Sequence, residues 1–485
     1  MKAIRILGIV LLWCGQLSAQ NTYSLLMASD ITHDPRDVIE LADGSMVTLV
    51  NEYTGHYYTP DSQLYKGVFL KFSPEGDTTL LYPPLGDTLF GFTTIIKSNN
   101  GGYFITGISI FPDSTTRSLM LLEVDDQFNK LWTKHYFIDS VFSHNLTKLV
   151  SVEDGYFAFG HIRYSITGGC YPFLCRIDNF GNILRQYIYP DRTPEAFEYT
   201  FNPDKSRIWV FSAPNLDPIN GSSMAVFDTN FNYLYSEALD ENTASHYTHH
   251  WQNDTSFYLS FSGNRTGATS QDVELFIGLY DTLMNPIYLN EFGDYESDDY
   301  SAWHTAISYQ NPDSIFYAGT IAVYFGYPPQ GYTNYIMLGQ TNEQLQERYR
   351  QYIGGDGYYY AEFIKATSDG GCFLGANRYN HTTLVKDAIF MKLDSKGELV
   401  YLVGQDVPNY RFMLYPNPAA AQLHIQTVIP TYSYLIRDIN GKLIDEGISL
   451  DKKHVVNVSH YGTGTYMITF IANGKLIETQ KFIKQ

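Results

Sequence analysis

Cysteine is scarce in this chain of 485 residues, which contains only four. Cys14 lies in an N-terminal apolar segment, so Cys170, Cys175 and Cys372 are left for the rest of the protein. Three cysteines spread over so long a chain cannot form a disulfide framework, and a large hydrophobic core must hold the fold together. Cys170 and Cys175 could pair only across a tight loop, since an extended strand would point them to opposite faces; free thiols are the alternative.

Long apolar runs are absent after the N-terminus. Residues 1–19 have a basic start, an apolar centre and small residues at the exit, which is the pattern of a cleaved signal peptide. Cys14 follows Trp13 rather than a small residue, so it belongs to the apolar centre and is not a lipidation site. No later run approaches the roughly 18 apolar residues that a membrane helix needs. We therefore expect an exported protein without a transmembrane segment.

Basic residues are also few, because 32 Lys and Arg stand against 51 Asp and Glu, for a formal net charge of −19. Nucleic acids and anionic membranes are bound through clustered Lys and Arg, so neither is an expected partner. The deficit is uneven: residues 20–410 carry 22 basic and 46 acidic residues, whereas residues 411–485 carry 8 and 5. This change of composition indicates a domain boundary near residue 410.

Common catalytic motifs are missing. The chain has no His-Glu-x-x-His, Gly-x-Ser-x-Gly or Gly-x-x-x-x-Gly-Lys-Ser/Thr sequence, and it lacks the Ser-x-Asp-x-Gly boxes of sialidases. These absences argue against an enzyme without excluding one, because hydrolases can assemble carboxylates from distant parts of a chain. For such a hydrolase or lyase acting on polysaccharide, Asp298, Asp299 and Glu362 are the candidate carboxylates.

Aromatic residues are abundant, with 41 Tyr and 30 Phe, and they favour strands. A two-part unit recurs seven times: a polar turn leads into a short aromatic or branched strand, and a second strand then runs into another polar turn. Its copies begin 50 to 59 residues apart, at Asp43, Asn100, Asp154, Asp204, Asp254, Asp313 and Asp369. Each copy supplies about four short strands, which cannot bury both faces alone, so the copies must stack.

The stacked copies predict an all-β fold with a seven-bladed β-propeller at residues 20–410. A linear β-solenoid is the alternative, but its repeats are usually shorter. The second turn of the unit is clearest in Val124–Trp132, "VDDQFNKLW". In this pattern the unit resembles the degenerate propeller repeats of exported bacterial proteins, which implies an architecture and no activity.

From Phe412 the chain has the pattern of a second, small β-domain. Pro416 and Pro418 keep its first segment out of a sheet interior. Two Asn-Gly pairs, beginning at residues 440 and 473, lie between strand-like runs and are strong hairpin signals. We predict a small immunoglobulin-like β-sandwich at residues 411–485.

The same residues carry a recognisable set of motifs in order: Tyr415, Pro416, Asn417, Pro418, Gly441, Gly462, Gly464, Tyr466, Lys481 and Lys484. With these motifs the segment closely resembles the C-terminal sorting domain of type IX secretion cargo in Bacteroidetes. The resemblance implies that the signal peptide takes the chain through the inner membrane and that this domain directs it across the outer membrane. It implies two partners, the type IX translocon and a sortase-like surface enzyme, and an extracellular or surface-attached location.

One histidine cluster suggests a metal site. On a strand, His246 and His250 would share one face and His249 would take the other, and His304 follows about one repeat later. His246, His250 and His304 are therefore candidate metal ligands at the centre of the propeller. The alternative is that these histidines lie at the channel or the surface and bind no metal.

The acidic loop Asp294–Asp299 could hold calcium, which takes six to eight oxygen ligands. It lacks the Asp-x-Asp-x-Asp-Gly spacing, and a solvated connecting loop explains its charge as well.

Tyrosines beside Gly and Pro, in residues 324–332 and 354–360, could lie in loops where their rings stack on sugars or peptides. The other interpretation is that Tyr358–Tyr360 begin an inner strand. Because the repeats are degenerate and no catalytic signature is present, we expect an exported propeller that binds a polysaccharide or a protein.

Overall fold

The structure is a computed structural model in which residues 21–54, 63–83, 85, 89–111, 117–138, 143–164, 170–189, 196–212, 223–239, 243–265, 272–293, 297–324, 328–399, 412–427, 431–439, 441–451, 453–472 and 475–485 are described. The expected signal peptide and the segment at 400–411 lie outside these residues. Every regular element in the described part is a β-strand, which confirms the all-β prediction. The same part contains no helix able to span a membrane.

Seven antiparallel sheets follow one another through residues 23–393. They are β2 (Thr32–Glu40), β3 (Met46–Thr54), β4 (Gln63–Phe72) and β5 (Thr78–Leu81); β6 (Leu89–Lys97), β7 (Tyr103–Ile110), β8 (Arg117–Val124) and β9 (Lys130–Tyr136); β10 (Ser143–Val152), β11 (Gly155–Arg163), β12 (Tyr171–Ile177) and β13 (Ile183–Ile188); β14 (Ala196–Phe201), β15 (Arg207–Ser212), β16 (Ser223–Asp228) and β17 (Tyr233–Ala238); β18 (Thr243–Asn253), β19 (Ser256–Asn264), β20 (Val273–Asp281) and β21 (Pro286–Phe292); β22 (Tyr300–Ser301), β23 (Ile307–Ser308), β24 (Ile315–Ile321), β25 (Tyr335–Thr341) and β26 (Glu347–Gly354); and β27 (Tyr358–Ala366), β28 (Cys372–Asn380) and β29 (Val385–Leu393) with β1 (Tyr23–Met27).

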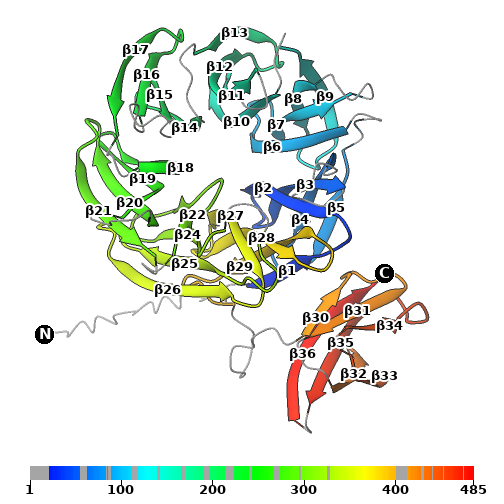
Figure 1. Ribbon diagram of the computed structural model, residues 1–485. Helices are drawn as coiled ribbons and strands as arrows, with labels where there is room; N and C mark the ends of the chain where they lie inside the picture. The colour runs from blue at the N-terminus through cyan, green and yellow to red at the C-terminus, as the bar shows by residue number, and fades with distance from the viewer. Residues whose placement is uncertain are drawn as a thin grey trace, which may run out of the picture.

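The sheets are arranged like propeller blades around a common centre (Figure 1). The first strand of each sheet, such as β2, β6 and β10, lies on the inner side of the ring, and the last, such as β9, β13 and β17, lies on the rim. The last sheet takes its rim strand from the other end of the chain, since β1 pairs antiparallel with β29 from Tyr23↔Lys392 to Met27↔Ala388. This pairing brings the N-terminal strand into the same sheet as β27, β28 and β29.

Neighbouring sheets share hydrophobic cores, so each sheet is buried on both faces. Phe104 stacks on Tyr156 of the next sheet with ring centroids 4.4 Å apart, while its neighbour Ile105 faces the core on the other side of its own sheet. Alternation along a strand therefore divides side chains between two interfaces rather than between core and solvent. This explains why β29 (VKDAIFMKL) is buried along its whole length.

A repeated Asp turn connects the third and fourth strands. In the β8–β9 turn, Asp125 Oδ1 accepts the backbone N–H groups of Gln127 and Asn129, and its Oδ2 accepts the Asn129 side-chain amide. Phe128 has a left-handed φ of 66°, which costs a β-carbon-bearing residue about 1 kcal/mol. Its ring offsets this cost because it is 5% exposed and stacks on Tyr103 at 4.8 Å. The same carboxylate pattern recurs at Asp178, Asp228 and Asp281.

Residues 412–485 form two further sheets. One contains β30 (Phe412–Tyr415), β31 (Gln422–Thr427) and β34 (Lys453–Asn457); the other contains β33 (Leu443–Ser449), β32 (Tyr432–Asp438), β35 (Gly464–Ala472) and β36 (Lys475–Lys484). Both contribute to one core, in which Phe412 stacks on Phe470 with centroids 3.9 Å apart. Lys481 contacts Asp77 at 3.5 Å and Thr78 Oγ1 donates to the Asn417 carbonyl, so this unit touches the β2–β5 sheet.

Candidate ligand-binding site

The inner strands are irregular, and their irregularities gather polar residues at the centre of the ring. In β2 the pairing skips from Pro35 to Asp37, so Arg36 is the extra residue of a β-bulge. The same kind of skip makes Thr93 the extra residue of β6 and Glu362 that of β27. A bulge re-aims the side chain of its extra residue and leaves its backbone outside the ladder. Bulges therefore bring Arg36 and Glu362 together although they are far apart in sequence.

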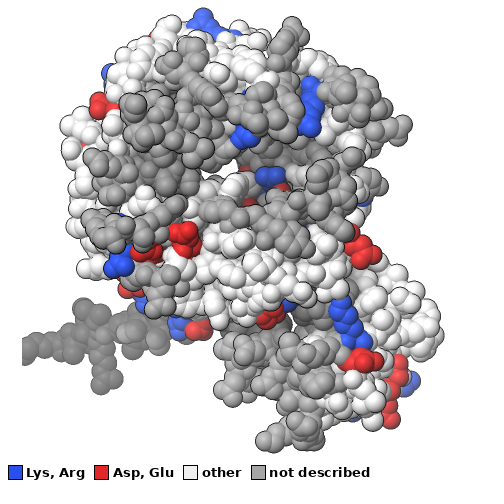
Figure 2. Space-filling view, in the orientation of Figure 1, with Lys and Arg blue, Asp and Glu red and all other residues white. Residues whose placement is uncertain are grey.

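We call Asp34, Arg36, His304, Glu362 and Asn377 the central cluster. The Arg36 guanidinium lies 2.8 Å from Asp34 Oδ2 and 3.3 Å from His304 Nε2. The Asn377 amide donates to Asp34 Oδ1 and to Glu362 Oε1, so one amide nitrogen bridges two carboxyl groups. Both carboxyl residues are 5% exposed. Figure 2 shows charged side chains of both signs at the hollow in the middle of the ring.

The two carboxyl groups of the central cluster differ in acidity. Burial raises the pKa of Glu362 to about 7, and the negative charge of Asp34 adds to this effect. Burial also acts to raise the pKa of Asp34, but the charges of Arg36 and then Lys386 outweigh it and lower that pKa. Burial and the Arg36 charge lower the pKa of His304 to about 3. At neutral pH Asp34 is thus ionised and His304 neutral, while Glu362 titrates.

The predicted histidine ligands do not form a metal centre in the described residues, which contain no group of three His, Cys, Asp or Glu arranged to hold an ion. His246 packs on Trp303 with centroids 4.3 Å apart, and His250 packs on Tyr309 at 5.6 Å. Burial lowers the pKa of His246 to about 4 and that of His250 to about 3. His304 is the one of the three that joins the central cluster.

The other two candidate carboxylates, Asp298 and Asp299, accept hydrogen bonds from backbone N–H groups. Asp298 Oδ1 accepts from the Val273 N–H at 3.2 Å, and Asp299 Oδ1 accepts from the Ala322 N–H at 2.8 Å. These bonds tie the segment before β22 to its neighbours. Residues 294–296 of the proposed calcium loop lie outside the described part of the chain. Of the three candidate carboxylates, Glu362 alone lies in the central cluster.

One of the two tyrosine-rich segments, residues 354–360, leads into an inner strand. Tyr358 begins β27 and is 0% exposed, and Tyr359 is 6% exposed, as the strand interpretation of this segment requires. The Tyr358 hydroxyl bonds to the Tyr324 backbone and to the Tyr360 hydroxyl, so these rings are held within the protein. Tyr324, at the edge of this group, is 43% exposed.

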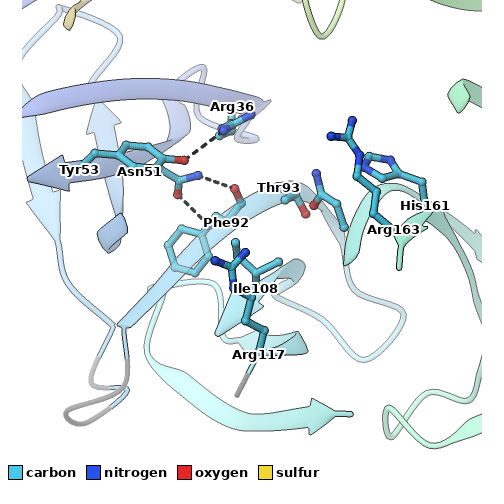
Figure 3. A pocket seen from close by; sticks show the side chains of 10 residues that line it. Arg36, Asn51, Tyr53, Phe92, Thr93, Ile108, Arg117, His161 and Arg163 are labelled. Carbon is cyan, nitrogen blue, oxygen red and sulfur yellow. Dashed lines mark hydrogen bonds between the residues drawn. The ribbon is translucent and has the colours of Figure 1, made fainter. Parts of the chain in front are cut away.

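A cavity of about 260 Å³ lies beside the central cluster. Arg36, Asn51, Tyr53, Phe92, Thr93, Ile108, Arg117, Asn145, His161 and Arg163 line it. Figure 3 shows Arg36, Arg117 and Arg163 around the same space, and they come from three consecutive sheets. Among the described residues, the lining contains three arginines and one histidine and no Asp or Glu. In a chain with an excess of acidic residues, this is a concentrated positive surface.

Hydrogen bonds between sheets and within one sheet hold the walls of the cavity. The Asn51 side chain donates to the Phe92 carbonyl at 2.9 Å and accepts from the Phe92 N–H at 2.7 Å, which links β3 to β6. Arg163 Nε donates to Cys170 Sγ at 2.9 Å.

Cys170, Cys175 and Cys372 are all buried free thiols, in agreement with the absence of a disulfide framework.

Sequence reasoning missed the arginines because they occupy no motif. Arg117 and Arg163 stand at the start of β8 and the end of β11, and only the folded sheets bring them together.

The sorting-motif residues are partly brought together. Asn417 Oδ1 accepts from the Ile483 N–H at 2.7 Å, and the Ala419 N–H donates to the Ile483 carbonyl, so Tyr415–Pro418 lie against the end of β36 that carries Lys481 and Lys484. The Tyr466 hydroxyl donates to the Gly462 carbonyl at 2.8 Å. Gly441 has a φ of 81° in a turn some distance away in sequence.

Three solved structures illustrate the structural similarities of the whole chain. A putative 6-phosphogluconolactonase from Bacteroides uniformis is 14% identical, with a TM-score of 0.42, covering 71% of this chain and 94% of its own. An acylaminoacyl peptidase from Pyrococcus horikoshii is 10% identical, with a TM-score of 0.42, and the alignment covers 82% of this chain and 58% of the peptidase. PorZ, a surface component of the type IX secretion system of Porphyromonas gingivalis, is 10% identical, with a TM-score of 0.22, and the alignment covers 93% of this chain and 82% of PorZ. These similarities carry no functional argument, and no curated protein matches the sequence.

A protein family matches the C-terminal unit. Residues 413–485 match the family described as the secretion system C-terminal sorting domain, which agrees with the resemblance of the motifs. The match covers β30–β36 and their shared core. Such a domain directs export to the cell surface or the extracellular space. Residues 413–485 of this chain are therefore a type IX secretion C-terminal sorting domain.

Proposed function

We propose that this protein is an exported, seven-bladed β-propeller that binds an extracellular ligand at the centre of its ring. The sorting domain supports the location, and the seven sheets with the β1–β29 pairing support a closed ring at residues 20–410. An immunoglobulin-like sandwich at residues 411–485 is supported by the two sheets that share one core. The translocon and a sortase-like enzyme are the partners that this domain would meet.

The cavity beside the central cluster is the main support for a binding function. It is concave, draws residues from three sheets and combines apolar with polar groups, as ligand sites usually do. The neighbouring carboxyl groups of Asp34 and Glu362 do not line it. A ligand held there would meet hydrogen-bond donors rather than a nucleophilic pair.

A thermal-shift screen tests this proposal. The chain without residues 1–19 is heated with plant, bacterial and host glycans and with extracellular proteins, and each small ligand that stabilises it is recovered for mass spectrometry. Stabilisation with the ligand intact supports a binding protein, because a ligand that prefers the folded state raises its melting temperature. The absence of any stabilising ligand from all classes would contradict the proposal.

One observation favours the hydrolase alternative. Asp34 and Glu362 are linked through one amide nitrogen and have pKa values pushed apart, which is the arrangement of an acid and a base. New reducing ends released from a polysaccharide by the wild-type chain, and lost in E362Q, would support an enzyme. Their absence across the glycans that bind would support the binding protein.

A further inference from the structure

We propose that the cavity lined by Arg36, Arg117, His161 and Arg163 binds a single sugar residue that carries one negative charge, either a carboxylate or a sulfate. This inference rests on the proposed binding function and specifies its ligand. We call these four residues the basic wall.

The positive charge of the basic wall favours a ligand that is an anion. Guanidinium groups gathered at one cavity create a positive potential that attracts an anion. Asp34 lies 2.8 Å from Arg36 and offsets that guanidinium, but Asp34 does not line the cavity. Arg117 and Arg163 reach the same space from two further sheets. A guanidinium presents a planar fork of N–H donors that matches the two oxygens of a carboxylate or sulfate.

The size and the neutral lining select a sugar rather than a bare ion. About 260 Å³ is slightly below the roughly 300–1,000 Å³ of sites for drug-sized molecules, which suits one sugar ring. Phe92 and Ile108 offer apolar surface for ring C–H groups, and Tyr53 and Thr93 offer hydroxyls for hydrogen bonding. An inorganic anion would use the arginines and leave this neutral lining without a role.

Two buried polar atoms point to the same chemistry. Asn145 Oδ1 and Arg36 Nε are shielded from solvent, and neither makes a hydrogen bond with another described residue. Both residues line the cavity. A buried polar atom without a partner costs roughly 1–3 kcal/mol, so a ligand that bonds to it gains an advantage. A sugar hydroxyl can donate to Asn145, and a ligand oxygen can accept from Arg36.

Two arginines of the basic wall, Arg36 and Arg163, are held in place before any ligand arrives. Arg36 is fixed by Asp34, by His304 and by the Tyr53 hydroxyl at 3.2 Å. Arg163 is fixed by Cys170, and the Asn51–Phe92 pair fixes the strand between them. Side chains that are ordered in advance lose little entropy when a ligand binds.

Isothermal titration of the chain lacking residues 1–19 tests the inference. The probes are methyl glucuronide, glucose 6-sulfate and, as the neutral match, methyl glucoside. We expect at least one charged probe to bind at least tenfold more tightly than methyl glucoside, and the comparison of the two charged probes tells carboxylate from sulfate. Equal affinity for the neutral sugar, or no binding of either charged probe, would overturn the inference.

Variants locate the site. R117Q and R163Q should each weaken binding of the preferred charged probe at least tenfold, and R163K, which keeps the charge, should weaken it less than R163Q. Arg185 on β13 is the matched control, because it bonds to Asn230 and does not line the cavity. R185Q should leave binding unchanged, and melting curves verify that each variant is folded. Retained affinity in folded R117Q and R163Q would place the ligand elsewhere.

The two proposals can fail separately. If the thermal-shift screen finds a neutral glycan or a protein that stabilises the chain while both charged sugars fail, the basic-wall inference is wrong and the binding function stands. If no ligand of any class stabilises the chain, the binding function itself is contradicted.

Discussion

Asp34 and Glu362 are both buried carboxyl residues, but their neighbours shift their pKa values in opposite directions. Both lie in the central cluster and share the Asn377 amide. Arg36 stands next to Asp34 and stabilises its charge at 2.8 Å, whereas Glu362 has His304 at 3.7 Å, a residue that is neutral at pH 7. The cluster therefore favours one negative charge over two.

The pKa of Glu362 predicts a pH-dependent gain in the variant E362Q. Burial raises this pKa from 4.5 to about 7, so the folded state holds a proton that the unfolded state releases between these values. The associated stability is complete below pH 4.5 and is lost as the pH rises through 7. Glutamine imitates the protonated side chain, so E362Q should match the wild type at pH 5 and exceed it at pH 8 by on the order of 1 kcal/mol or more.

Urea unfolding at pH 5 and pH 8 measures this difference. E75Q, which changes an exposed glutamate on the β4–β5 turn, is the control and should show no such pH dependence. A loss of stability in E362Q that is equal at both pH values would show that Glu362 is ionised throughout.

The sequence suggested histidines as the ligand-binding residues, whereas in the structure arginines line the candidate site. Histidines in one short segment are conspicuous in a sequence, yet His246 and His250 pack on aromatic rings of the following sheet. Arg36, Arg117 and Arg163 are separated by 127 positions and meet only because three sheets are neighbours. A site assembled across sheets leaves no spacing to recognise in a single sequence.

At the element scale the Asp turn was predictable because it is local. Its Asp, Asn and left-handed residue lie within five positions, and the hydrogen bonds join those residues to one another. The bulges of the inner strands were not predictable from composition. Their extra residues are as different as Arg36, Thr93 and Glu362, so only strand pairing reveals them.

The Asp turn predicts a contrast between two adjacent aspartates. D125A removes the acceptor of three hydrogen bonds in the β8–β9 turn, while Phe128 must still adopt its left-handed φ. D126A makes the same change of charge one residue later, at an exposed side chain. We expect D125A to lower the melting temperature by about 2 °C and D126A to leave it nearly unchanged. Equal shifts would mean that charge, and not the turn, controls the effect.

At the scale of the whole molecule, the repeated strand units predicted an all-β fold, and every regular element in the described residues is a strand. The motifs of the sorting domain were recognisable in the sequence, and the family match at residues 413–485 confirms that resemblance. The role of β1 was not predicted, because the five residues Tyr23–Met27 carry no signal in the sequence for a partner near residue 390.

The pairing of β1 with β29 predicts that a small deletion has a large effect. Removing residues 21–27 takes away the rim strand of the last sheet and the Tyr23 ring, which stacks on Phe72 at 5.5 Å. It also leaves the edge of β29 unpaired, which favours association between chains. We expect a melting temperature lower by roughly 5 °C or more and larger species in size-exclusion chromatography.

Removal of residues 412–485 is the matched comparison for this deletion. It eliminates a whole sorting domain but leaves every strand of the seven sheets, so the ring should melt close to its original temperature. A β1 deletion that melts like the full chain would contradict a stabilising role of the β1–β29 pairing.

Hydrogen–deuterium exchange on the chain lacking residues 1–19, with and without the glycan that stabilises it most, would locate the ligand site within the ring. We expect slower exchange in peptides around Arg36, Arg117 and Arg163 at the centre of the ring, with the rim strands β9, β13 and β17 unchanged. Protection confined to the rim strands or to residues 412–485 would contradict a ligand site at the centre.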